Sequence, residues 1–104
     1  MSDETNPFDH AQIDDVIHGR LRLGIMAYLS TASPAIFGEL KAKVGATDGN
    51  LSTHLRKLED AGYVKQEKRF VRRRPQTRVF LTDKGRKAWL IWIDRMQGLM
   101  RAAE

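Results

Sequence analysis

Six polar side chains within residues 47–57 are of the types that recognise nucleic acids. Asn and Arg make paired hydrogen bonds to adenine and guanine edges, and Ser and Thr hydroxyls reach either bases or phosphates. If the stretch is a helix, Thr53 and Arg56 share its outward face, with Asn50 and Lys57 beside them. The pattern fits a helix that enters a groove of duplex DNA as well as it fits an ordinary surface helix. The six candidates are Thr47, Asn50, Ser52, Thr53, Arg56 and Lys57.

Catalytic and metal-binding chemistry finds little support in the same region. Asp48, Ser52 and His54 are the residue types of a hydrolytic triad, but positions two apart point about 200° apart on a helix. The other histidines, His10 and His18, lack the spacing of metal ligands, and the chain has no cysteine. We therefore expect no enzyme activity, no metal site and no cofactor.

A dense run of basic residues follows the candidate helix. Residues 65–78 contain one acid, Glu67, and Pro75 marks a loop tip or a strand edge because proline cannot donate to a strand ladder. Like charges at this density repel one another unless water or a polyanion neutralises them. Such a run is usually a solvated surface, but beside the candidate helix it indicates phosphate contacts. The basic residues are Lys65, Lys68, Arg69, Arg72, Arg73, Arg74 and Arg78, of which Arg69, Arg72, Arg73 and Arg74 are the candidates for binding.

Apolar spacing predicts the helix that would carry the first group. Leu51, Leu55 and Leu58 recur at helical spacing, and Thr47 ahead of them is a good N-cap. The spacing predicts a helix over 47–61 whose leucines face a core. The candidate polar residues then lie on the opposite face.

The neighbouring elements complete a helix-turn-helix with a β-hairpin. A helix over 37–44 leads into the candidate helix across the short turn at Gly45-Ala46. Tyr63-Val64 opens one strand, and residues 77–81, rich in β-branched and aromatic side chains, form the other. Residues 35–36 are expected to add a short edge strand.

Longer helices are expected at both ends of the chain, over about 10–31 and from Thr82 to about 101. Residues 89–93 are apolar nearly all round, and a lone surface helix of this kind would leave apolar side chains in water. We expect this helix to pack on its own domain and on a second copy of the chain, although wrapping by its own chain alone is the alternative. The candidate dimer contacts are Ile13, Ile17, Trp89, Trp92, Ile93, Met96 and Met100.

The order of these motifs resembles the winged helix-turn-helix of MarR- and ArsR-like transcriptional regulators, of the small stand-alone winged-helix DNA-binding domain type. The resemblance spans roughly residues 11–95. It implies a homodimer that binds operator DNA and controls transcription, with a small-molecule effector left open. The cysteine pair of many ArsR-like metal sensors is missing from this chain. The matching motifs are GRLRL at 19–23, GNLSTHL at 49–55, RP at 74–75 and LTDKG at 81–85.

The expected fold class is α+β, mostly α: a three-helix core, a two-stranded wing and a long C-terminal helix. A chain of 104 residues is about one small domain, expected over 9–104, with a flexible tail over 1–8. No apolar run reaches the length of a membrane span, and no signal peptide leads the chain. We expect a cytoplasmic, nucleoid-associated protein that does not bind membranes.

The charge distribution favours a polyanionic partner. The net charge is +5, and the sequence pI is about 9.9. Residues 1–19 contain five of the acids and no Lys or Arg, so the basic field lies over the rest of the chain. Such a field attracts DNA, RNA or an anionic membrane alike.

Two functions remain open on the sequence. The first is a sequence-specific transcriptional regulator that acts as a homodimer on a pseudo-palindromic operator in double-stranded DNA. The second is a winged-helix interaction module that binds protein or RNA. Gly49, Asn50, Thr53 and Arg56 leave the candidate helix slim and polar, whereas a protein-docking helix would expose apolar or aromatic anchors. The sequence therefore favours the first function.

Overall fold

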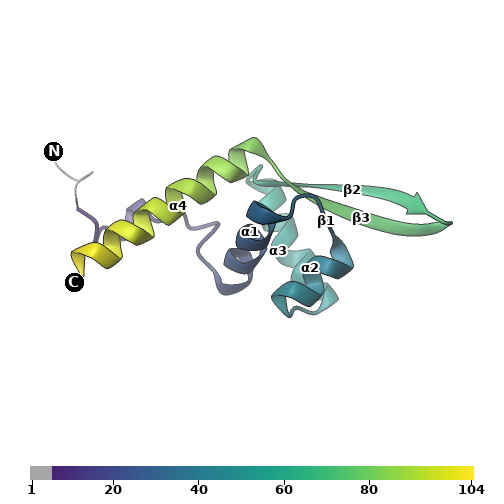
Figure 1. Ribbon diagram of the computed structural model, residues 1–104, viewed down its shortest axis with the longest axis horizontal. Coiled ribbons are helices and arrows are strands. Elements are labelled where there is room, and N and C mark those ends of the chain that lie inside the picture. The colour runs from purple at the N-terminus through teal and green to yellow at the C-terminus, as the bar shows by residue number, and fades with distance from the viewer. Residues whose placement is uncertain (1–5) are drawn as a thin grey trace.

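The computed structural model describes residues 6–104, and its elements follow the order of a winged helix-turn-helix (Figure 1). Three helices surround a small core, a three-stranded sheet lies beside them, and a long helix ends the chain. This is the α+β, mostly α, architecture that the sequence predicts. Of the tail predicted over 1–8, residues 1–5 lie outside the described part. The elements are η2 (His10–Gln12), α1 (Arg20–Thr31), β1 (Ala35–Ile36), α2 (Phe37–Val44), α3 (Asp48–Asp60), β2 (Val64–Val71), β3 (Arg74–Leu81) and α4 (Asp83–Ala102).

The core is apolar and comes from α1, α2, α3, the sheet and the segment before α1. The predicted leucine stripe of α3 is fully buried. Each buried leucine stabilises the fold by about 1.5–3 kcal/mol, so the stripe fixes which face of α3 looks outward. The core residues are Ile17, Ile25, Met26, Leu29, Ala35, Leu40, Leu51, Leu55, Leu58, Val64 and Val79.

β3 is the central strand of the sheet and pairs antiparallel with β1 on one side and β2 on the other. β1 covers β3 only at Arg78 and Val79, so the rest of that side of β3 is an open edge. Pro75, opposite Phe70, lies on this stretch, where its missing N–H breaks no ladder to β1. The strand therefore begins earlier than the predicted 77–81.

The start of α4 is fixed against the turn between α3 and β2. The Thr82 side chain caps α4 by accepting a hydrogen bond from the Gly85 amide at 2.9 Å, and its hydroxyl donates to the Gly62 carbonyl at 2.6 Å. A Cβ at Gly85 would come within 2.1 Å of the Tyr63 carbonyl oxygen, so only glycine fits there. The predicted N-cap at Thr82 is confirmed.

The helix predicted over 10–31 is wrong in its first half. A side-chain oxygen of Asp14 accepts hydrogen bonds from the Val16 and Ile17 amides at 2.9 and 3.4 Å, which turns the chain, and Gly19 is extended ahead of α1. The segment lies over the core instead, and Ile17 is 0% exposed. Ile17 is therefore wrong as a dimer contact, because its side chain is already buried within the protomer. The Tyr63 hydroxyl donates to Asp14 and ties this segment to the start of the wing.

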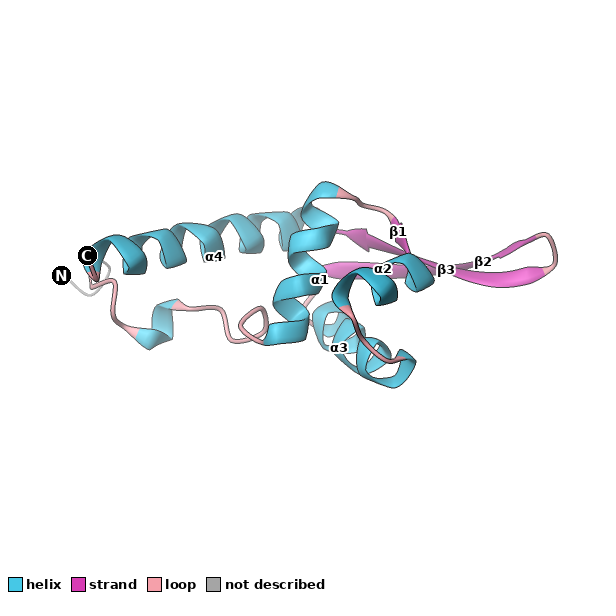
Figure 2. Ribbon diagram, turned by 60° about the horizontal axis from the view of Figure 1, so that its bottom comes forward, coloured by secondary structure: helices cyan, strands magenta, loops and turns pink. Residues whose placement is uncertain are grey.

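The molecule is elongated because two elements project beyond the core. It measures 57 × 23 × 21 Å, with a radius of gyration of 15.5 Å. A compact chain of this length would have a radius of gyration of about 13 Å. The β2–β3 hairpin extends to one end of the long axis and α4 extends to the other (Figures 1 and 2).

Candidate nucleic-acid interface

The outward face of α3 and its flanks carry five of the six polar residues proposed from the sequence. The side chains of Asn50, Thr53 and Arg56 are exposed, and Ser52 and Lys57 lie exposed beside them. Within residues 6–104, no acidic side chain pairs with Arg56 or Lys57. These donors are therefore available to a ligand, and their contacts with bases or phosphates stay a prediction.

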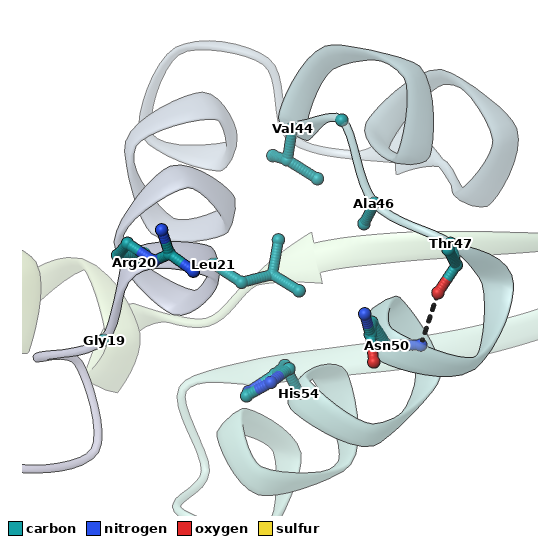
Figure 3. Close-up of a pocket in the computed structure, with 9 residues that line it drawn as sticks. Gly19, Arg20, Leu21, Val44, Ala46, Thr47, Asn50 and His54 are labelled. Carbon is teal, nitrogen blue, oxygen red and sulfur yellow. Dashed lines mark hydrogen bonds between the residues drawn. The ribbon is translucent and has the colours of Figure 1, made fainter.

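Thr47 has the N-cap role that the sequence predicts, and its DNA contact stays a prediction. Its hydroxyl oxygen accepts a hydrogen bond from the Asn50 amide at 3.2 Å and so caps α3 (Figure 3). Its hydroxyl hydrogen remains able to donate to a phosphate oxygen. Asp48, in the first turn of α3, pairs with Lys41 of α2 at 2.9 Å, which joins the two helices of the helix-turn-helix.

One carboxylate, Glu67, partly neutralises the charge at the base of the wing. Glu67 on β2 accepts a hydrogen bond from the Arg78 guanidinium on β3, and its carboxylate lies 3.8 Å from the Lys65 ammonium. The Arg78 hydrogen bond holds the pKa of Glu67 below its ordinary value. Both cations lie over the Phe80 ring, at 5.1 Å for Arg78 and 5.9 Å for Lys65. These two basic residues thus have partners on the wing itself, although the Lys65 side chain remains exposed.

The tip of the wing keeps its charge. Arg72, Arg73 and Arg74 are exposed, and the Arg69 guanidinium donates to the Gln76 side-chain oxygen at 2.9 Å, which leaves its charge in place. None of these arginines forms an ion pair with a carboxylate of residues 6–104. The predicted wing candidates therefore share one end of the hairpin, where a polyanion can neutralise them.

The turn at the wing tip stores backbone strain. Val71 pairs with Arg74, so the turn consists of Arg72 and Arg73, with φ of 52° and 67°. Two-residue hairpin turns of this kind favour Asn and Gly, because left-handed backbone costs other residues about 1–2 kcal/mol. Strain that persists at one site points to a function of the side chains there. The conformational preference of the turn therefore does not explain why arginines occupy both positions.

A groove separates the outward face of α3 from the wing. Its volume is about 570 Å³, and its walls include Ser52 and Arg56 from α3 and Lys68 from β2. Two hydrogen bonds fix the wing to α3 beside it: Glu59 accepts from the Gln66 backbone amide at 3.1 Å and from its side-chain amide at 3.2 Å. The helix and the wing thus form one preorganised cationic surface.

A second groove, of about 640 Å³, was not found from the sequence. It lies between the start of α1 and α3, and Arg20, Asn50 and His54 line it (Figure 3). Arg22 stands behind it: its guanidinium donates to the Val16 carbonyl and to His54 Nδ1, the latter at 2.9 Å. Burial, together with nearby Arg22, lowers the pKa of His54. The Arg22–His54 contact joins residues 32 apart in the chain, so no local sequence pattern predicts it.

The predicted dimer contacts are only partly free. Trp89 and Trp92 are stacked with their ring centroids 5.4 Å apart, and both pack against the core of their own protomer. Ile13, Ile93 and Met96 are half-buried. Met100 is 61% exposed, and so are two α4 residues missing from the predicted set, Leu90 at 58% and Ile91 at 56%.

Two further kinds of site have no counterpart in the part of the chain that the structure describes. No helix there is long and apolar enough to cross a bilayer. Over the same residues, no three His, Asp or Glu side chains gather closely enough to hold a metal ion.

Comparison with known proteins places this geometry in a family. Residues 21–100 match the family model of the winged helix DNA-binding domain. An uncharacterized protein of Methanocaldococcus jannaschii is 35% identical over 89 residues, which cover 86% of this chain and 97% of that protein.

Solved structures share the fold over most of the chain. A transcriptional regulator homologue from Pyrococcus horikoshii superposes with a TM-score of 0.82 at 27% identity, covering 100% of this chain and 99% of that one. A MarR-family transcriptional regulator from Silicibacter pomeroyi has a TM-score of 0.65 at 24% identity, covering 84% of this chain and 58% of that one. The chain therefore belongs to the winged helix DNA-binding domain family.

Proposed function

We propose that the protein is a transcriptional regulator that recognises specific DNA sequences as a homodimer on a pseudo-palindromic operator. The observation that carries the proposal is the strained, unpaired arginine tip of the wing beside the polar face of α3. Within residues 6–104, none of the large apolar side chains that are exposed lies on α3. A protein-docking helix would expose such anchors, so the surface suits DNA better than a protein partner.

In this proposal α3 enters the major groove. Asn50, Thr53 and Arg56 face the bases, because these side chains are exposed on the outward face and have the donors and acceptors that base edges require. Ser52, Lys57 and the Thr47 hydroxyl contact the sugar-phosphate backbone and set the position of the helix.

The wing supplies affinity that depends little on sequence. Arg72, Arg73 and Arg74 reach the backbone of the adjacent DNA or its minor groove, with Arg69 nearer the base of the hairpin. Each phosphate contact releases condensed counterions, so affinity falls as salt rises.

The dimer rests on α4. This helix projects away from the core, opposite to the wing (Figure 1). It exposes Leu90, Ile91 and Met100. Exposed apolar side chains on a projecting helix are best covered by the same helix of a second copy, since a two-fold axis closes the assembly. Two copies then present two α3 helices, and DNA half-sites one turn apart require a spacing of about 34 Å.

A gel-shift experiment tests the proposal. Fragments of the host genome compete for the purified protein, with an RNA duplex of equal length as competitor. We expect a small set of fragments to be retained while RNA competes poorly. Equal retention of all fragments, or displacement by RNA at equal concentration, would favour the interaction-module alternative instead.

A further inference from the structure

Phe70 is the most exposed large apolar side chain of the described residues, at 77%, and it stands among the arginines of the wing. It lies on β2 directly opposite Pro75 on β3. Side chains directly opposite each other on neighbouring strands lie about 4.5–5.5 Å apart at Cβ, so the two form one small apolar surface. The core does not use this surface, because β1 reaches β3 only at Arg78 and Val79.

The apolar pair faces the same side of the wing as the groove beside α3. Residues two apart on a strand share a face, so Phe70 and Lys68 project together on β2, as do Pro75 and Thr77 on β3. Lys68 and Thr77 line the 570 Å³ groove with Arg56 of α3. Phe70 and Pro75 therefore continue that groove toward the tip of the wing.

The surroundings of the pair restrict what it can contact. Lys68 shares this face of β2, and Arg72 and Arg73 form the turn just beyond it. None of these three has an acidic partner among residues 6–104, so the occupant must be polyanionic as well as apolar. The walls of the DNA minor groove meet both conditions, because deoxyribose rings present C–H groups between phosphates. In RNA the 2′-hydroxyl occupies that surface.

The length of the hairpin is consistent with this contact. Phe70 is two residues before the turn, which corresponds to about 7 Å along a strand. When the hairpin lies along the sugar-phosphate backbone with Arg72 and Arg73 on phosphates, Phe70 is therefore within reach of the sugars at the minor-groove rim.

We propose that Phe70, backed by Pro75, packs on the deoxyribose rings at the minor-groove rim and makes the wing selective for DNA over RNA. The inference rests on the proposed DNA binding of the wing. The arginines attract either nucleic acid through phosphate charge, whereas Phe70 adds affinity only where no 2′-hydroxyl must lose its water. Burial of the Phe70 ring thus adds to the DNA affinity in a way that salt does not weaken.

The test compares Phe70→Ala with the wild-type protein on a 30-base-pair DNA duplex and on an RNA duplex of the same sequence. We expect a loss of about tenfold or more in DNA affinity, as for removal of a buried phenyl group, with less than a twofold change for RNA. The slope of log affinity against log salt should stay unchanged. Arg73→Ala should instead weaken both duplexes alike and lower that slope. Phe8→Ala removes an equally aromatic exposed side chain away from the wing and serves as the matched control.

The outcomes separate this inference from the proposed function. Wild-type protein that binds neither duplex contradicts DNA binding itself. Wild-type protein that binds DNA, with Phe70→Ala weakening both duplexes equally or neither, contradicts only the role of Phe70. Circular dichroism verifies that each variant is folded, and little change is expected because Phe70 is so exposed.

Discussion

The two ends of the long axis differ in the kind of side chain that has no partner within the protomer. At the tip of the wing, Arg72 and Arg73 are unpaired among the described residues and sit in strained backbone. At the other end, α4 exposes Leu90, Ile91 and Met100 in regular, unstrained helix. The first end lacks counter-charge and the second lacks apolar cover. In the proposed function, a polyanion supplies the missing charge at the wing and a second copy of the chain supplies the missing apolar contact at α4.

The difference has an energetic consequence. Binding at the wing should weaken steeply with salt, because it depends on counterion release. Binding at α4 should respond little to salt, because burial of apolar surface drives it. Substitutions at the two ends should therefore differ both in how much affinity they remove and in whether the loss depends on salt.

The largest effect is expected at α4. Ile91→Glu places a carboxylate in the proposed apolar interface, so the dimer should dissociate and operator affinity should fall about 10²–10⁴-fold as linkage of the half-sites is lost. Sedimentation measures the dimer and gel shift the affinity. Gln97→Glu adds the same charge at an exposed polar position of the same helix and should change neither. An Ile91→Glu protein that remains dimeric places the interface elsewhere.

At the wing, Arg73→Ala combined with Arg74→Ala should weaken operator and random duplex by the same factor. Two lost phosphate contacts should lower the salt slope by about two. Titrations at several salt concentrations give the slope, and sedimentation should show the dimer intact. Full affinity with an unchanged slope is the result that rejects a phosphate role for these arginines.

Between the two ends, α3 should account for sequence preference. Arg56→Ala should cost ~1–3 kcal/mol at the preferred site and relax the preference at one base position. Selection from a randomised duplex pool measures that preference, with Lys57→Ala as the neighbouring control. If Arg56→Ala lowers affinity equally for every sequence, Arg56 contacts only the backbone.

The strained turn gives a test in which stability and binding change in opposite directions. Arg72→Asn with Arg73→Gly supplies the residues that the turn prefers, so the free energy of unfolding should rise by about 1 kcal/mol. Binding to any duplex should weaken, because two cations are lost. Chemical denaturation and gel shift measure the two effects. A variant that is destabilised would show that the turn is not strained.

The smallest effect is expected at His54, which lies at neither end. Because its pKa is lowered in the folded protein, the unfolded chain takes up the proton first. The contribution of His54 to the free energy of unfolding should therefore be constant above its ordinary pKa of 6.5 and fall as the pH drops below that value. His54→Gln keeps an acceptor for Arg22 and should remove this pH dependence, measured by thermal unfolding at several pH values. An identical pH profile in the variant would assign the titration to another group.

Much of the fold follows from local signals in the sequence. The leucine stripe and Thr47 cap predict α3, and Thr82 predicts the start of α4 to within a residue. In each case a cap and a spacing act within a few residues of each other, so the surroundings do not alter the outcome.

The errors occur where distant contacts decide. Ile13, Val16 and Ile17 have helical spacing, but Asp14 turns the chain and Tyr63 holds it from 49 residues away. A segment that lies over a core buries residues at irregular intervals, so helical spacing alone does not prove a helix. Asp14 and Gly19 were turn signals that the spacing obscured.

The candidate site could be predicted only in part, because some of its features depend on contacts between distant residues. Composition alone identifies the arginines of the wing, because charge density is a local property. The ion pairs of Lys65 and Arg78 with Glu67, which distinguish the partly neutralised base of the wing from its unpaired tip, depend on the register of β2 and β3. The exposure of Ile91 likewise depends on where α4 leaves the core.

The most direct test of the account is a hydroxyl-radical footprint of the wild-type protein on a genomic fragment that it retains, together with the mass of the complex. The account predicts two copies of the chain on two inverted half-sites, their centres about one helical turn apart, with protected sugars flanking each half-site. A single protected site without symmetry, bound by one copy, would contradict the assignment of the two ends to DNA and to a second copy.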